Sequence, residues 1–106
     1  MHGLPVALKD IISTSEMPTK YGARIKLKKR RNLDAKIVEL LKKAGAIIMG
    51  KTVTCELAFL SPSKTKNPHD YTRTPGGSSS GSAAVIASDM APVSYTHLTL
   101  PTILRV

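Results

Sequence analysis

The sequence is poor in several features that would narrow its function. It has one cysteine and no tryptophan in 106 residues. A lone Cys55 can form neither an intrachain disulfide nor a cysteine-based zinc site, so we expect a small buried hydrophobe there. No apolar run approaches the roughly 20 residues of a membrane-spanning helix. The first residues also lack the charged and apolar regions of a signal peptide, which favours a cytoplasmic protein.

Acidic residues are scarce as well, with 7 Asp and Glu against 16 Lys and Arg, for a net charge of +9. This excess of positive charge makes nucleic acid a candidate partner. Much of it lies in one run, from Arg24 to Arg31, without aromatic residues for base stacking. A solvated loop is the favoured interpretation of this run, and a basic nucleic-acid-binding segment is the alternative of another class. The histidines His2 and His69 have no second ligand at a suitable spacing, so we expect no metal and no cofactor.

The apolar pattern predicts an α/β fold. Residues 4–8 and 46–49 are short apolar runs typical of buried strands, the second of them parallel. Between them, residues 35–44 have the apolar spacing of an amphipathic helix, with Asp34 as its N-cap and Gly45 just after its end. Strand, helix and strand in this order form a βαβ unit. A short helix is expected within residues 53–60, a loop at 61–77 and a buried helix at 83–87.

Residues 45–52 match the phosphate-binding pattern G-x-x-x-x-G-K-[ST]. That pattern needs a strand before its first glycine and a flexible loop after it. Here a predicted helix precedes Gly45, and the intervening residues belong to a predicted strand. We therefore interpret the match as accidental.

Two other features indicate chemistry. Residues 74–82 form a turn of glycine and serine that feeds directly into a helix, which suits an anion or a developing oxyanion. Lys9 ends an otherwise apolar strand. A lysine at such a place is commonly a solvent-facing strand end. If it is partly buried instead, its charged form is disfavoured, and it can then act as a base for a serine hydroxyl.

Taken together, these motifs closely resemble the amidase signature family. The resemblance rests on residues 3–10, 34–52, 66–69 and 74–84, in the family's order and spacing, and it covers residues 2–92. It implies the N-terminal part of the amidase signature fold, an incomplete mixed β-sheet flanked by helices. The Gly-Gly-Ser-Ser-Ser-Gly-Ser stretch that begins at Gly76 is its most specific part.

The resemblance also implies site residues. Lys9 matches the family's lysine base, and Ser78 matches the bridging serine that follows a cis peptide bond. Gly76, Gly77 and Ser79 match the substrate and oxyanion region. The nucleophilic serine of the family comes about two dozen residues further on, within a glycine-rich turn that this chain lacks. In the family, that serine attacks a carboxamide carbonyl, and water then clears the acyl-enzyme.

Residues 93–106 depart from the family's pattern and contain no glycine. The codons GTC TCT TAT ACA CAT CTG ACG CTG CCG ACG, a common transposon-type sequencing adapter, translate as Val93 to Thr102. We interpret residues 1–92 as a partial amidase domain and residues 93–106 as a non-native tail. The nucleophile's role is therefore not assigned to Thr102. The start at Met1 also resembles an internal position, because family members carry a long segment before the lysine motif.

The sequence thus predicts a fragment of an amidase that hydrolyses a small carboxamide, the fragment itself being inactive. The near alternative is the A subunit of the glutamyl-tRNA(Gln) amidotransferase, which uses the same triad to supply ammonia. Members of that kind usually carry an acidic Asp-Glu-Phe-like stretch where this chain has Cys55-Glu56-Leu57, which favours a stand-alone amidase. The amide substrate and the oligomeric state stay open.

Overall fold

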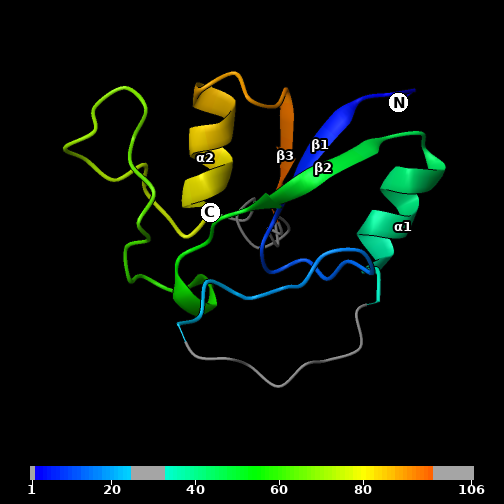
Figure 1. The fold of residues 1–106 in the computed structure, drawn as a ribbon, viewed down its shortest axis with the longest axis horizontal. Helices are drawn as coiled ribbons and strands as arrows, with labels where there is room; N and C mark the ends of the chain where they lie inside the picture. The colour runs from blue at the N-terminus through cyan, green and yellow to red at the C-terminus, as the bar shows by residue number, and fades with distance from the viewer. Residues whose placement is uncertain (1, 25–32, 97–106) are drawn as a thin grey trace, which may run out of the picture.

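A computed structural model describes residues 2–24 and 33–96. Its elements are a parallel three-stranded sheet, two α-helices and one short 3-10 helix (Figure 1). In chain order they are β1 (Pro5–Lys9), α1 (Lys36–Lys43), β2 (Ile47–Thr52), η1 (Glu56–Ala58), α2 (Ser80–Ala87) and β3 (Val93–Tyr95). The predicted α/β class is confirmed. Most of the basic run, at 25–32, and the end of the chain, at 97–106, lie outside the described residues.

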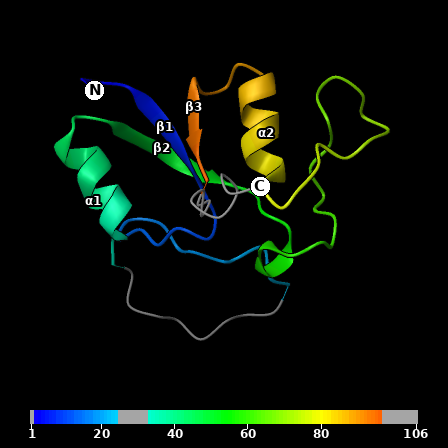
Figure 2. The same cartoon turned by 180° about the vertical axis from the view of Figure 1, so that it is seen from behind.

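Strand β1 is the centre of the sheet, with β2 on one side and β3 on the other. Both neighbours run parallel to it, with Lys9 opposite Thr52 and Leu8 opposite Lys51. Side chains alternate between the two faces of a strand, so Lys9 and Thr52 share one face while Leu8 and Lys51 share the other. The two α-helices lie on opposite sides of the strands (Figures 1 and 2).

Helix α1 covers the face of β1 that carries Val6 and Leu8. Val38 and Leu41 are buried against these strand residues, as the apolar spacing predicts. Gly45 follows the helix with a φ of +86°, also as predicted. The predicted N-cap is wrong, because Ala35 takes that position. The Asp34 carboxylate instead accepts hydrogen bonds from the backbone N–H of Ser15 and from Lys42 Nζ, at 2.6 and 2.9 Å.

Strand β2 is parallel to β1, as predicted, but it is not buried on all sides. It forms the edge of the sheet in the described part of the chain, and the side chains of Ile47 and Met49 are 56% and 53% exposed. Continuous apolar sequence predicts burial on both faces of a strand. Here Ile48 packs against the core, whereas Ile47 and Met49 are left exposed.

Helix α2 is also exposed where the sequence predicts burial. Its apolar second half, which contains Ile86, is half-buried to exposed, whereas its first turn, Ser80 to Ser82, is buried. The reason is that α2 meets the sheet through its N-terminal end. The backbone N–H of Gly81 donates to the carbonyl oxygen of Val53 at 2.8 Å, at the end of β2. The short helix predicted within 53–60 is η1.

The third strand, β3, pairs with β1 from Val6 to Leu8. Its three residues belong to the segment that the sequence predicts to be a non-native tail. No helix in the described ranges is long and apolar enough to cross a bilayer.

Candidate active site

Lys9 and Ser78 meet on the α2 side of the sheet. Lys9 ends the central strand and is 3% exposed. Its Nζ donates a hydrogen bond to Ser78 Oγ at 2.6 Å, across 69 positions of sequence. Burial lowers the pKa of the Lys9 amine below its ordinary value of 10.5, and the electrostatic influence of Cys55 opposes this. A lysine that loses its proton more readily than usual therefore lies in contact with a serine hydroxyl.

The backbone around Ser78 is fixed by the segment that follows β2. The Ser78 carbonyl oxygen accepts hydrogen bonds from the Cys55 backbone N–H at 2.9 Å and from Thr54 Oγ1 at 3.1 Å. Thr54 is 1% exposed. The Gly77–Ser78 peptide bond is cis. The two hydrogen bonds to the Ser78 carbonyl oxygen hold this residue at the end of the sheet, where Lys9 lies.

The two positions before Ser78 require glycine for different reasons, backbone conformation at Gly76 and lack of space at Gly77. Gly76 has a φ of +84°, a conformation that glycine adopts at little cost, and its N–H donates to Thr74 Oγ1 at 3.2 Å. Gly77 has no room for a side chain, since a Cβ there would lie 2.6 Å from Cys55 Sγ. Cys55 is free and buried, as the sequence predicts.

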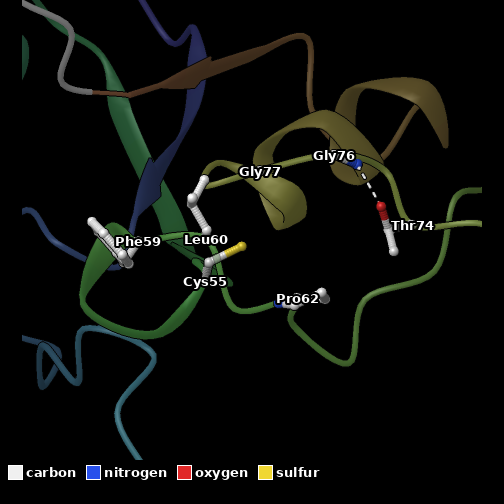
Figure 3. A pocket seen from close by; sticks show the side chains of 7 residues that line it. All are labelled: Cys55, Phe59, Leu60, Pro62, Thr74, Gly76 and Gly77. Atoms are coloured by element: carbon white, nitrogen blue, oxygen red, sulfur yellow. Dashed lines mark hydrogen bonds between the residues drawn. The ribbon is translucent and has the colours of Figure 1, made fainter.

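A pocket of about 150 Å³ opens beside these glycines. Figure 3 shows the residues that line it, with the Cys55 side chain pointing toward the stretch that contains Gly76 and Gly77. The full lining is Cys55, Phe59, Leu60, Pro62, Thr74, Gly76 and Gly77. The pocket is mostly apolar. Two of its lining residues, Gly76 and Gly77, directly precede Ser78 in the chain.

Of the serines after Ser78, Ser80 and Ser82 have hydroxyl partners elsewhere in the fold. Ser79 occupies the N-cap position of α2 and makes no capping hydrogen bond with its side chain. Ser80 Oγ lies 2.7 Å from Ser63 Oγ, and Ser82 Oγ lies 2.8 Å from Thr52 Oγ1. The structure thus brings Lys9 and Ser78 together, whereas Ser79, the next residue in the chain after Ser78, makes no capping hydrogen bond with its side chain.

Sequence reasoning missed the residues that support this pair. Thr52 anchors α2 and Thr54 anchors the Ser78 backbone, and both come at or just after the end of an apolar strand without a distinctive motif of their own. The one available signal was the Gly50-Lys51-Thr52 triplet, whose residues form the end of β2 and not a phosphate loop. In the described ranges, no three His, Cys, Asp or Glu side chains gather where they could hold a metal ion.

This geometry agrees with the comparison to known families, in which the Amidase model matches residues 1–96. The chain belongs to the amidase signature family, and the predicted membership is confirmed.

Among individual relatives, the chain is 45% identical to the A subunit of the glutamyl-tRNA(Gln) amidotransferase of Koribacter versatilis over 98 residues. That alignment covers 87% of this chain and 20% of the relative. The corresponding protein from Archaeoglobus fulgidus is also 45% identical, with 87% and 21% covered.

Solved structures give the same result for the fold. The peptide amidase of Stenotrophomonas maltophilia superposes with a TM-score of 0.79 at 38% identity, covering 88% of this chain and 21% of that one. An amidase family protein from Bacillus anthracis gives a TM-score of 0.77 at 38% identity, with the same coverage. The chain therefore has the local fold of an amidase signature protein, and it spans about a fifth of the length of these relatives.

Proposed function

We propose that the protein to which this segment belongs hydrolyses a carboxamide C–N bond through a Ser–cis-Ser–Lys triad. Lys9 is the base and Ser78 is the bridging serine. The observation that carries this proposal is the 2.6 Å contact between a buried lysine amine and a serine hydroxyl. Family membership supports the same chemistry. The substrate is then a small amide, and the protein acts in the cytoplasm.

In this proposal, Ser78 carries a proton between the nucleophile and Lys9. With Lys9 neutral, its amine accepts the Ser78 proton while Ser78 Oγ accepts the proton of the nucleophilic serine, which this chain does not supply. The nucleophile attacks the amide carbonyl, and the proton returns along the same path to the leaving nitrogen. Water then hydrolyses the acyl-enzyme. The lowered pKa of Lys9 supports this role, because a base must be unprotonated to work.

Gly76, Gly77 and Ser79 contribute the substrate and oxyanion region in this scheme. Their support is position, since Gly76 and Gly77 line the pocket beside Ser78 and Ser79 follows it at the start of α2. The apolar lining suits an amide with an apolar group next to its carbonyl.

The test uses the longer protein that carries this segment. We expect Ser78→Ala and Lys9→Met each to lower kcat by roughly 10²–10⁴-fold, the usual contribution of proton transfer by a positioned side chain. Ser88→Ala and Lys36→Met are matched controls at exposed positions and should leave kcat unchanged. Full amide hydrolysis by the Ser78→Ala protein would overturn the proposal.

A role as the A subunit of an amidotransferase is the second candidate, favoured by the 45% identity to proteins of that name. The residues Cys55-Glu56-Leu57, in place of an acidic Asp-Glu-Phe-like stretch, favour a stand-alone amidase. The two differ in their acceptor. A stand-alone amidase releases ammonia or an amine from a free amide without other subunits. An amidotransferase component would instead need its partner subunits and pass ammonia to a tRNA-bound acyl group.

We further propose that residues 93–106 are a translated adapter and that the amidase segment ends at residue 92, with the family match and the pairing of β3 extending a few residues into the adapter. The match between the adapter codons and Val93 to Thr102 supports this. A further support is Ser94, whose buried hydroxyl has no hydrogen-bond partner among the residues that the structure describes. Buried hydroxyls in evolved proteins are nearly always paired. Sequencing the coding DNA is the test, and codons unlike the adapter at Val93 to Thr102 would contradict the proposal.

A further inference from the structure

An ion pair lies directly behind the candidate site, on the other face of the sheet. Lys51 Nζ lies 3.1 Å from Asp10 Oδ1, at the carboxyl ends of β2 and β1. The two side chains are only 11% and 15% exposed. For comparison, the Lys36–Glu39 pair on α1 has side chains that are 74% and 46% exposed. The Asp10–Lys51 pair is therefore largely desolvated, so losing one partner leaves a costly unpaired charge.

The pair also fixes the loop that follows β1. Lys51 Nζ donates to Thr19 Oγ1 at 2.9 Å, and the Asp10 carboxylate accepts from the Lys20 backbone N–H at 3.3 and 3.4 Å. The Tyr21 backbone N–H donates to the Asp10 carbonyl oxygen at 3.0 Å. Residues from β2 and from the loop after β1 thus converge on one carboxylate and one ammonium, both largely shielded from solvent.

Asp10 is joined to Lys9 by a single peptide unit. Its backbone N–H donates to the Thr52 carbonyl oxygen at 2.9 Å, so the ladder between β1 and β2 continues past Lys9. Consecutive side chains of a strand point to opposite faces. If the Asp10 side chain is held on one face, the Lys9 side chain is directed to the other, toward Ser78.

We propose that Asp10 and Lys51 are a positioning pair that holds the Lys9 amine against Ser78 from the opposite face of the sheet. The inference rests on the proposed function, because it assigns a purpose to the position of Lys9. It also gives the Gly-Lys-Thr triplet at the end of β2 a role unrelated to phosphate. Lys51 anchors the strand end to the loop on one face, and Thr52 anchors it to Ser82 on the other.

The test uses the longer protein that carries this segment, and it measures structure and not activity. Backbone amide exchange of Tyr21 reports on the loop, and an NMR titration of the Lys9 side chain reports on its burial. In Lys51→Met we expect the Tyr21 amide to exchange roughly tenfold faster or more, because the Asp10 charge is left unpaired. The pKa of Lys9 should rise toward its ordinary value, since a loosened strand end admits water and no longer holds the amine at Ser78.

Asp10→Asn is the second variant and should also accelerate exchange at Tyr21. Lys51→Arg keeps the charge and the reach to Asp10, and it should restore both readouts. Lys36→Met removes an exposed ion pair and is the matched control, with no effect on either.

Several outcomes would overturn the inference. One is an unchanged Tyr21 amide and an unchanged Lys9 titration in both Lys51→Met and Asp10→Asn. Another is equal acceleration at the Ala44 amide, which bonds to Leu40 on α1, because the pair would then support the whole fold and not Lys9. A Tyr21 backbone amide that exchanges without protection in the wild-type protein would equally contradict the inference. Failure of the proposed function would be recognised by a different measurement, namely full amide hydrolysis by the Ser78→Ala protein. The exchange and titration measurements on Asp10 and Lys51 do not depend on that result.

Discussion

Thr52 Oγ1 and Ser82 Oγ lie 2.8 Å apart, and the two residues are 4% and 5% exposed. The contact joins the last residue of β2 to the first turn of α2. Thr52 is also the partner of Lys9 in the sheet register. The Lys9–Ser78 contact and the Thr52–Ser82 contact therefore lie side by side, and both connect the strand ends to the glycine-serine segment.

Removing both of these hydroxyls should destabilise the fold by less than the sum of the two single removals. We expect Thr52→Val or Ser82→Ala to lower the free energy of unfolding by about 1–3 kcal/mol, the cost of leaving one buried polar group unpaired. The double variant should lose less than the sum of the two, because it leaves neither group unpaired. Urea unfolding measures all three. Strictly additive losses would contradict the expected coupling.

Gly81 should not tolerate a methyl group. A Cβ at this position would lie 2.3 Å from the backbone nitrogen of Val53 and 2.7 Å from its carbonyl oxygen. Gly81→Ala should therefore destabilise by roughly 1–3 kcal/mol, the usual cost of overpacking, despite alanine's higher helix propensity. Gly50→Ala is the control, because nothing lies within 4 Å of its Cβ position. Thermal unfolding that ranks the two variants equally would show that α2 does not dock on Val53.

Stability should depend on alkaline pH through Lys9. The pKa of Lys9 is lowered by burial in the folded chain and returns to about 10.5 when the chain unfolds. Between these two values the unfolded chain binds more protons than the folded one, so the free energy of unfolding rises with pH across that window. Urea unfolding at several pH values should show this rise in the unchanged chain and a smaller one in Lys9→Met. Parallel curves for the two proteins would contradict the prediction.

Asp34 should make the fold sensitive to acid. Hydrogen bonds from the Ser15 backbone N–H and from Lys42 lower the pKa of its carboxyl group to about 2, from 3.8. A folded-state pKa below the unfolded one adds stability that is fully present above pH 3.8 and is lost as the pH falls toward 2. Asp34→Asn should remove this part of the acid loss. Unfolding measurements between these pH values test it, and an identical acid profile in the variant would contradict it.

Local sequence signals predicted the elements of this fold well. The βαβ order, the buried Val38 and Leu41 face and Gly45 after α1 all follow from apolar spacing and from the conformational freedom of glycine. The N-cap failed because Asp34 had a better partner, the ammonium of Lys42 in the last turn of the same helix. A competing long side chain of this kind is not visible in a local motif.

Burial was predicted less well than secondary structure. Ile47, Met49 and Ile86 have the sequence environment of core residues, yet they are exposed. Apolar spacing says which face of an element avoids water, but it does not say what covers that face. The relatives that the chain matches are about five times as long, so this segment is only part of what would decide burial in a whole protein.

The candidate site was identified by resemblance and not by spacing alone. Lys9 and Ser78 carry distinctive flanking residues. Lys51 and Thr52 belong only to a phosphate motif that was interpreted as accidental, and Asp10 gave no signal of its own. Their contacts cross from one strand to another and from strand to helix. Such contacts depend on register and on the face of the sheet, which the sequence pattern alone did not resolve.

The separation of Lys9 and Ser78 by 69 positions has a consequence for folding kinetics. Neither residue can find the other until β1 has paired with β2 across α1 and the α2 turn has docked on Val53. Long-range parallel pairing is intrinsically slow, since the loop entropy is lost before the contact is gained. We therefore expect the lysine and the serine to meet late on the folding path, after the chain as far as α2 has been synthesised.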